Sequence, residues 1–150
     1  MGRALLAGAL YASLAYRDPE TGAPGISRIA LGLDKDGMPV TLISALAQHF
    51  SALRADPACA LLVGEPGPKG DPLTHPRLMI TAAARFVDRN TADHAALRGL
   101  WLTTHPKARL YVDFADFAFV RFGLHAALLN GGFGKAFRFG AADLRAAPQD

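Results

Sequence analysis

The sequence predicts a mainly β fold with flanking helices, an α+β arrangement in one domain of 150 residues. The first observation is the segment 42–63, which reads without interruption as a strand, a short helix and a second strand. The helix is indicated by apolar residues at helical spacing before Asp56-Pro57 ends it, namely Leu46, Phe50 and Leu53. The second observation is composition: 51% hydrophobic and 19% charged residues suffice for one core of this size.

The N-terminal segment combines Arg3 with the apolar run ALLAGALYASLA and so imitates a secretory signal. We expect a helix instead, because the run carries Tyr11 and Ser13 and is too short to span a bilayer. It also lacks a strong small-x-small cleavage pattern before Arg17. The sequence therefore predicts a cytoplasmic protein that does not bind membranes.

The later elements follow from local signals. Residues 25–33 and 78–87 are predicted strands, and residues 64–74, with three glycines and three prolines, form a predicted loop. Thr91 is a candidate cap for a helix that ends at His105-Pro106. Residues 114–122 are apolar on both strand faces, which predicts a strand covered on two sides, one by the core of the protein and the other by a helix or a second subunit.

A cluster of polar residues follows the strand at residues 40–44. Ser44 occupies the expected N-cap of the next helix, where free amides and the helix dipole favour an anion. Gln48 offers two amide donors, and His49 offers a ring donor that a phosphate would make cationic. The cluster is therefore a candidate phosphate site without a metal. The alternative is a plain N-cap at Ser44 with a solvated His49.

Charge and cysteine content exclude several function classes. The net charge of +3 is mild, and the basic residues are scattered, which disfavours nucleic acid as a partner. Cys59 is the only cysteine and is expected to be a small buried hydrophobic residue. The five histidines lack metal-ligand spacing, and no nucleophile elbow is present, so we expect no metal site and identify no catalytic residue.

The order of these motifs resembles the FMN-binding split-barrel family, the pyridoxamine 5'-phosphate oxidase-like proteins, and within it the haem-utilisation subgroup. The resemblance rests on the block SALAQHFSALRADP, the lead DPLTHP into a strand, and DFADFAFVRF followed by GGFGKAF. It implies a six-stranded antiparallel split β-barrel. It also implies a homodimer that binds FMN at the subunit interface.

The resemblance carries cofactor-binding roles to further residues. It places Ser44, Gln48 and His49 at FMN-phosphate contacts, and a fourth contact at Ser27, where the oxidases use arginine. Arg28 is adjacent but faces the other way on an alternating strand, so we expect only one of the two to reach FMN; a solvated Arg28 is the alternative.

Two positions outside the phosphate cluster are also implied. Arg77 matches a polar flavin-facing position, with a charge at the barrel rim as the alternative. Lys135 follows the glycines at 131, 132 and 134 and would lie near the flavin ring, with a simple bend in the last strand as the alternative. The pattern is not a nucleotide phosphate loop, because Asn130 replaces the first glycine and Ala136 follows the lysine.

Two functions remain open at this point. The first is an FMN-dependent oxidoreductase of unassigned substrate, and the second is a non-catalytic flavin- or haem-binding protein. In the haem-degrading subgroup the iron ligand is a histidine of an additional C-terminal domain, so haem oxygenase activity is disfavoured here unless His75 or His125 substitutes. Pyridoxamine phosphate oxidation is disfavoured because the family's C-terminal substrate-binding segment is missing.

Overall fold

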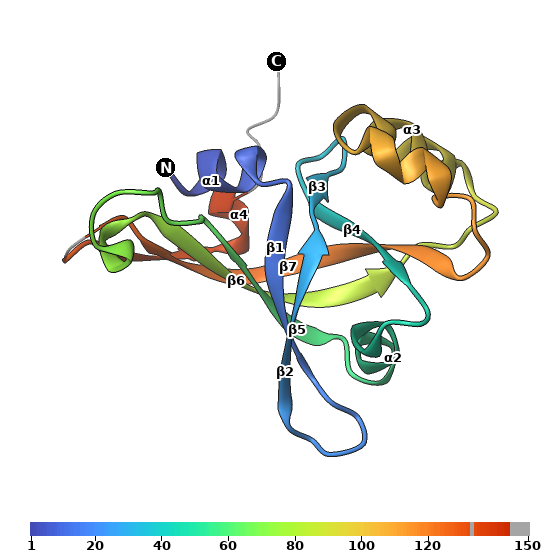
Figure 1. The fold of residues 1–150 in the computed structure, drawn as a ribbon, viewed down its shortest axis with the longest axis horizontal. Coiled ribbons are helices and arrows are strands. Elements are labelled where there is room, and N and C mark those ends of the chain that lie inside the picture. Colours follow the sequence, from blue (N-terminus) through green and yellow to red (C-terminus); the bar gives the residue numbers. More distant parts are fainter. Residues whose placement is uncertain (133, 145–150) are drawn as a thin grey trace.

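Residues 1–132 and 134–144 are described by the structure, a computed structural model (Figure 1). Within them, eight strands form one antiparallel sheet in the order β2-β1-β5-β6-β7-β4-β3, with β8 paired to β7. The elements are α1 (Gly2–Gly8), β1 (Tyr11–Arg17), β2 (Pro24–Ala30), β3 (Gly32–Leu33), β4 (Pro39–Ser44), α2 (Gln48–Ala55), β5 (Ala58–Val63), η1 (Pro72–Thr74), β6 (Arg77–Phe86), α3 (Ala92–Thr104), η2 (Pro106–Leu110), β7 (Phe117–Asn130), β8 (Ala136–Gly140) and α4 (Ala141–Leu144).

The sheet curls because its two outermost strands, β2 and β3, are almost consecutive in the chain. β2 pairs with β1, β3 pairs with β4, and only Leu31 separates β2 from β3. The mainly β, split-barrel-like prediction is thereby confirmed, but the expected number of six strands is wrong for the described residues. The predicted strand at 25–33 breaks where the chain changes partner, and β1, in a segment expected to be helical, is an additional strand.

The N-terminal prediction is correct only for α1. The helix ends at Gly8, Ala9 is extended, and residues 11–17 form β1 between β2 and β5. Ala12, Leu14 and Tyr16 are buried at a period of two. Alanine and leucine favour a helix locally, but the pairing of β1 on both edges overrides that propensity.

The start of α2 also differs from expectation. The N-cap position is Ala47 rather than Ser44, and the helix begins at Gln48. Leu46, expected on the apolar helix stripe, lies in the preceding turn and is 90% exposed. The end of the helix is as predicted, since Asp56 is its C-cap and Pro57 follows.

Strand β7 is longer than predicted and organises two cores. It begins at Phe117 rather than at residue 114 and continues to Asn130. Val120 and Phe122 lie in the main core inside the curled sheet. Phe119 lies in a second core with Trp101 of α3, which confirms the expectation that both faces of this strand are covered.

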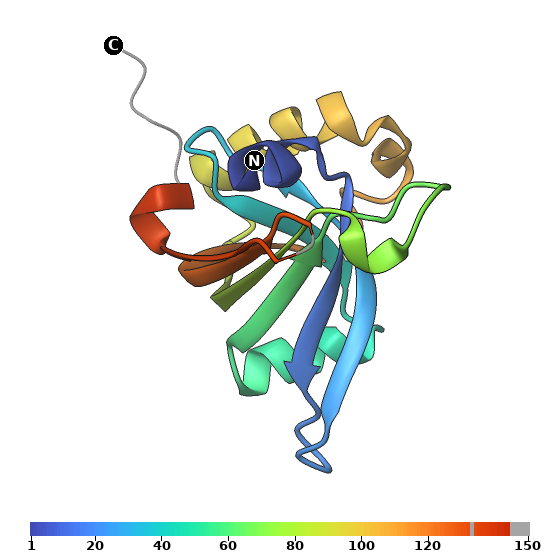
Figure 2. The same ribbon diagram turned by 90° about the vertical axis from the view of Figure 1, so that its left-hand side faces the viewer.

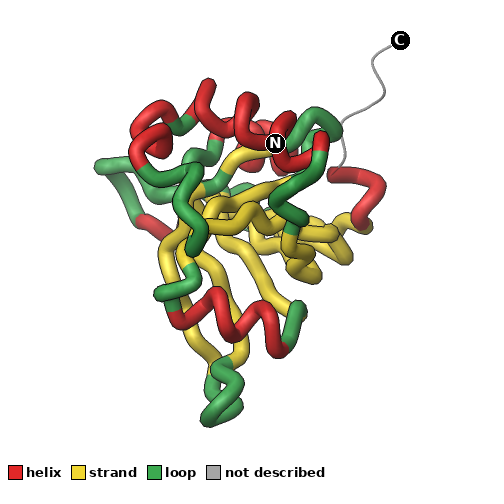
Figure 3. The backbone as a smooth tube through the Cα atoms, turned by 90° about the vertical axis from the view of Figure 1, so that its right-hand side faces the viewer, coloured by secondary structure: helices red, strands yellow, loops and turns green. Residues whose placement is uncertain are grey.

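The helices lie at the periphery of the strands (Figure 3). Figure 2 shows α1 near one end of β1 and α2 near the other. The cap of α3 is as predicted, because the Thr91 hydroxyl accepts a hydrogen bond from the His94 amide at 3.1 Å. Within the part of the chain that the structure describes, no helix is long and apolar enough to cross a membrane.

Candidate functional site

The predicted phosphate donors at the start of α2 are already engaged. Ser44 Oγ donates to Asp116 Oδ2 at 3.0 Å and accepts from the Leu46 amide at 3.2 Å. Gln48 Nε2 donates to Asp18 Oδ2 at 3.1 Å, and Gln48 Oε1 accepts from the Tyr16 hydroxyl at 3.2 Å. A phosphate placed here would have to displace two carboxylates from these donors.

His49 lies beside this group and is half-buried, with its ring centroid 6.2 Å from that of Tyr16. Burial lowers its pKa below the ordinary value of 6.5, which disfavours the cationic form of the ring. Two nearby cations are also engaged. Arg17 Nε lies 3.6 Å from Asp56 Oδ2, and the Arg54 guanidinium lies 3.9 Å from the Phe86 ring centroid.

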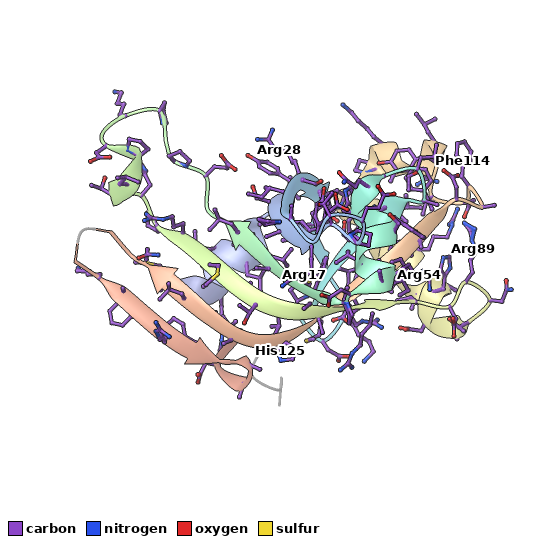
Figure 4. The ribbon with its side chains drawn as sticks, turned by 90° about the horizontal axis from the view of Figure 1, so that it is seen from below. Arg17, Arg28, Arg54, Arg89, Phe114 and His125 are labelled. Carbon is purple, nitrogen blue, oxygen red and sulfur yellow. The ribbon has the colours of Figure 1, made fainter. Side chains whose placement is uncertain are left out.

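Ser27 and Arg28 point to opposite sides of β2, as the alternation predicts. Ser27 is half-buried on the same side as the buried Ile29, whereas Arg28 is exposed. The Arg28 guanidinium lies 5.4 Å from the ring centroid of Tyr11 (Figure 4). Which of the two contacts a cofactor stays a prediction.

Arg77 and Lys135 lie at the far end of the sheet from the phosphate cluster. Ser44 pairs with Phe117 at the start of β7, whereas Arg77 pairs with Asn130 at its end. Thirteen residues of β7 separate these pairings, which is roughly 40 Å along an extended strand. The structure therefore does not bring the seven predicted residues into one site within a protomer.

Both distant residues make hydrogen bonds to neighbouring turns, Arg77 through its side chain and Lys135 through its backbone. Arg77 Nη1 donates to the Leu73 carbonyl at 3.0 Å. The Lys135 amide donates to the Gly132 carbonyl at 3.2 Å, and the Lys135 carbonyl accepts from the Gly131 amide at 2.7 Å. This turn joins β7 to β8, and a contact between Lys135 and a cofactor stays a prediction. Phe133 of the GGFGKAF motif lies outside the described residues.

One side of the sheet, which we call the outer face, carries small and apolar residues that are only partly buried. It lies opposite the main core and consists of Ser13 and Ala15 of β1, Ala60 and Leu62 of β5, Met79 and Thr81 of β6, and Ala126 and Leu128 of β7. Leu62, a large apolar residue of this face, is 42% exposed.

A hollow of about 190 Å³ lies on the outer face where β6, β7 and β8 meet. Met79 and Leu128 supply apolar walls, Thr81 a hydroxyl and Arg138 an exposed cation. Arg138 pairs with Leu128 across β8 and β7. Sequence reasoning missed this group, because only the pairing of β8 brings Arg138 beside β6 and β7.

The histidines differ in how their rings are held. His75 accepts from the Gly67 amide at Nδ1 and contacts the Lys69 carbonyl through Nε2 at 2.9 Å. His105 contacts Thr104 Oγ1 and the Leu10 carbonyl through its two nitrogens and stacks on Trp101. No cluster of three or more histidine, cysteine or acidic residues suited to a metal ion occurs within residues 1–132 and 134–144.

The fold and part of the sequence match proteins of known description. A pyridoxine phosphate oxidase family protein from Clostridium acetobutylicum has a TM-score of 0.68 at 16% identity and covers 94% of this chain and 92% of its own. The chain has the split-barrel fold of the pyridoxamine phosphate oxidase-like proteins. No protein-family model matches it.

Several of the matching proteins have names that mention haem. The haem binding protein from Mycobacterium smegmatis has a TM-score of 0.86 at 26% identity and covers 95% of this chain. A non-canonical haem oxygenase, HOZ, from Arabidopsis thaliana chloroplasts is 39% identical over 100 residues, or 67% of this chain. The chain spans 57% of the mycobacterial protein and 29% of the plant protein.

Proposed function

We propose that this protein binds haem on the outer face of its sheet. The observation that carries the proposal is the hollow between β6, β7 and β8, which combines apolar walls with one exposed guanidinium. The relatives named above support the ligand, since one is a haem-binding protein and another a haem oxygenase. This favours the haem-binding alternative over an FMN oxidoreductase.

The residues of the hollow fit the chemistry of haem. The macrocycle is flat and apolar, so Met79 and Leu128 can pack against it, and methionine adapts readily to an irregular surface. The propionates are carboxylates, and the Arg138 guanidinium can donate to one of them through two hydrogen bonds. When bound, haem supplies an iron that takes axial ligands and exchanges electrons.

The proposed site also needs a second copy of the chain. The hollow measures about 190 Å³, whereas ligand pockets span roughly 300–1,000 Å³. The outer face carries alanine and serine beside Leu62 and Met79, which lets another backbone approach closely and buries apolar surface. We therefore include in the proposal a homodimer packed through this face, with haem between the two copies.

The test of haem binding is a titration of the purified protein with haem and, separately, with FMN, followed by gel filtration. We expect a Soret band that elutes with the wild-type protein. Leu128→Arg places a charge in the hollow and should remove the band, whereas Leu110→Arg, at a position 79% exposed on η2, should retain it. If both variants lose the Soret band, or both retain it, the proposed site is wrong. If the wild type binds no haem, the proposed function is wrong.

The dimer is tested separately by sedimentation. Leu62→Arg should shift the protein toward the monomer because an outer-face charge would be buried against its own copy. Leu110→Arg is the matched control and should leave the association state unchanged. A wild-type monomer at all concentrations would exclude this part of the proposal.

FMN is the second candidate, supported by the position of His49 at the start of α2, with its ring 6.2 Å from the Tyr16 ring and Gln48 beside them. A flavin there would make an FMN-dependent oxidoreductase the function. His49→Ala should then weaken FMN binding by about 1–3 kcal/mol, the scale of a charge-assisted hydrogen bond. An FMN dissociation constant that does not change in this variant would exclude His49 as a phosphate contact.

A further inference from the structure

One residue of β7 is displaced from the regular register. Ala82 pairs with Leu124 and Thr81 pairs with Ala126, so His125 is the extra residue of a β-bulge. Leu124 and Ala127 are both buried, whereas His125 and Ala126 are both exposed. The bulge therefore turns two consecutive side chains toward the outer face, where alternation alone would allow one.

His125 differs from the other histidines because its ring is neither packed nor hydrogen-bonded within the described residues. The rings of His75 and His105 are held through both nitrogens. His94 lies edge-on to Phe119 at a centroid distance of 5.3 Å, and His49 is half-buried. His125 is exposed on β7, near the end of β8, and no hydrogen bond joins its ring to another residue of the described ranges (Figure 4).

The bulge places this ring beside the proposed haem site. Ala126, the next residue, lines the hollow, and Thr81, which pairs with Ala126, lines it as well. Bulges commonly redirect a side chain next to a functional site. A neutral imidazole is a common ligand of haem iron, and it binds through one nitrogen lone pair.

We infer that His125 is the axial ligand of haem bound in the outer-face hollow. The inference rests on the proposed function, because it names the iron ligand of that same site. One Fe–N bond forms from the lone pair of the imidazole, and a water on the iron leaves. No electron is transferred in this step. Arg138 then fixes the propionate end of the same macrocycle.

The experiment compares haem complexes of wild-type protein, His125→Ala and His94→Ala by absorption and resonance Raman spectroscopy. We expect His125→Ala to shift the Soret band, to lose the Fe–imidazole vibration and to raise the haem dissociation constant at least 10-fold. Added imidazole should restore the wild-type spectrum. His94→Ala is the control and should keep all three properties, since its ring lies on α3 against Phe119.

A second variant keeps the test informative if His125→Ala does not fold. His125→Cys should give the spectrum of a thiolate-ligated haem, which a purely structural role for His125 would not produce. Unchanged spectra in both His125 variants, with haem still bound by wild type, exclude the ligand but leave the proposed function standing. If the wild type binds no haem, both proposals fail.

Discussion

Removal of Arg121 should test whether its ion pairs stabilise the fold. Arg121 Nε donates to Asp34 Oδ2 at 2.7 Å, and its two terminal nitrogens donate to the carboxylate of Asp93 at 2.9 and 3.0 Å. The Asp34 side chain is 4% exposed and that of Arg121 is 25% exposed. Arg121→Met keeps an apolar stem of similar length but leaves Asp34 buried without its cation.

The expected loss follows from this burial. Removing one partner of a fully buried ion pair costs about 3–5 kcal/mol. Because Arg121 is partly exposed and Asp34 keeps hydrogen bonds from the Asp36 and Met38 amides, we expect about 2–4 kcal/mol. For a chain of this length that corresponds to a fall in Tm of roughly 4–16 °C. Urea unfolding monitored by circular dichroism gives both the midpoint and the slope.

The matched control is Arg98→Met. Arg98 also binds a carboxylate through two nitrogens, at 2.8 and 2.7 Å from Asp113, but both side chains are well exposed. Exposed ion pairs contribute little, so this variant should unfold close to the wild-type midpoint. Equal destabilisation by the two substitutions would refute the argument that burial decides the cost.

Acid provides an independent check of the same network. The hydrogen bonds from Arg121 lower the pKa of Asp93 below its ordinary value of 3.8. A lowered carboxyl pKa stabilises the folded state above the unfolded pKa, and that stabilisation is lost as pH falls through the folded value. The difference in the free energy of unfolding between wild type and Arg121→Met should therefore become smaller as the pH falls below about 4.

Three further outcomes are expected. Gly25→Ala should cost about 1–3 kcal/mol, because its Cβ would lie 2.5 Å from the Tyr16 ring, whereas Gly99→Ala, in open space on α3, should stabilise by about 0.5–1 kcal/mol; urea unfolding measures both. Burial raises the pKa of the Cys59 thiol to about 12, so a maleimide at pH 7 should label it only after unfolding. His75→Ala should accelerate proteolysis within residues 64–74, because it removes the ring contacts to Gly67 and Lys69.

Each of these outcomes has a clear contradiction. Equal stability of the two glycine variants would mean that the Tyr16 ring moves freely. Rapid labelling of the folded protein would show that Cys59 is accessible and ionises readily. An unchanged cleavage rate would show that the loop is held without His75.

Elements with local signals could be predicted from the sequence, and elements that depend on distant pairing could not. Asp56-Pro57 and Thr91 mark a helix end and a helix start within a few residues, and both predictions are confirmed. β1 was missed because its seven residues form a strand only by pairing with β2 and β5.

The same distinction applies to the candidate site. The motif around Ser44 is visible locally, but its acceptor Asp116 lies 72 residues further along the chain, so the sequence did not reveal that the hydroxyl is engaged. The bulge at His125 is likewise a property of the pairing between β6 and β7. A single strand read alone carries no signal for it.

The partners of β4 have a consequence for synthesis of the protein. β4 pairs with the two-residue β3 and with β7, and five of its six residues are buried. Seventy-three residues separate Ser44 from Phe117 in β7, so at about 5–20 residues per second the ribosome needs roughly 4–15 s to supply that partner. During this interval the apolar segment PVTLIS has an unpaired edge, so the unfinished chain is open to wrong strand pairing and aggregation.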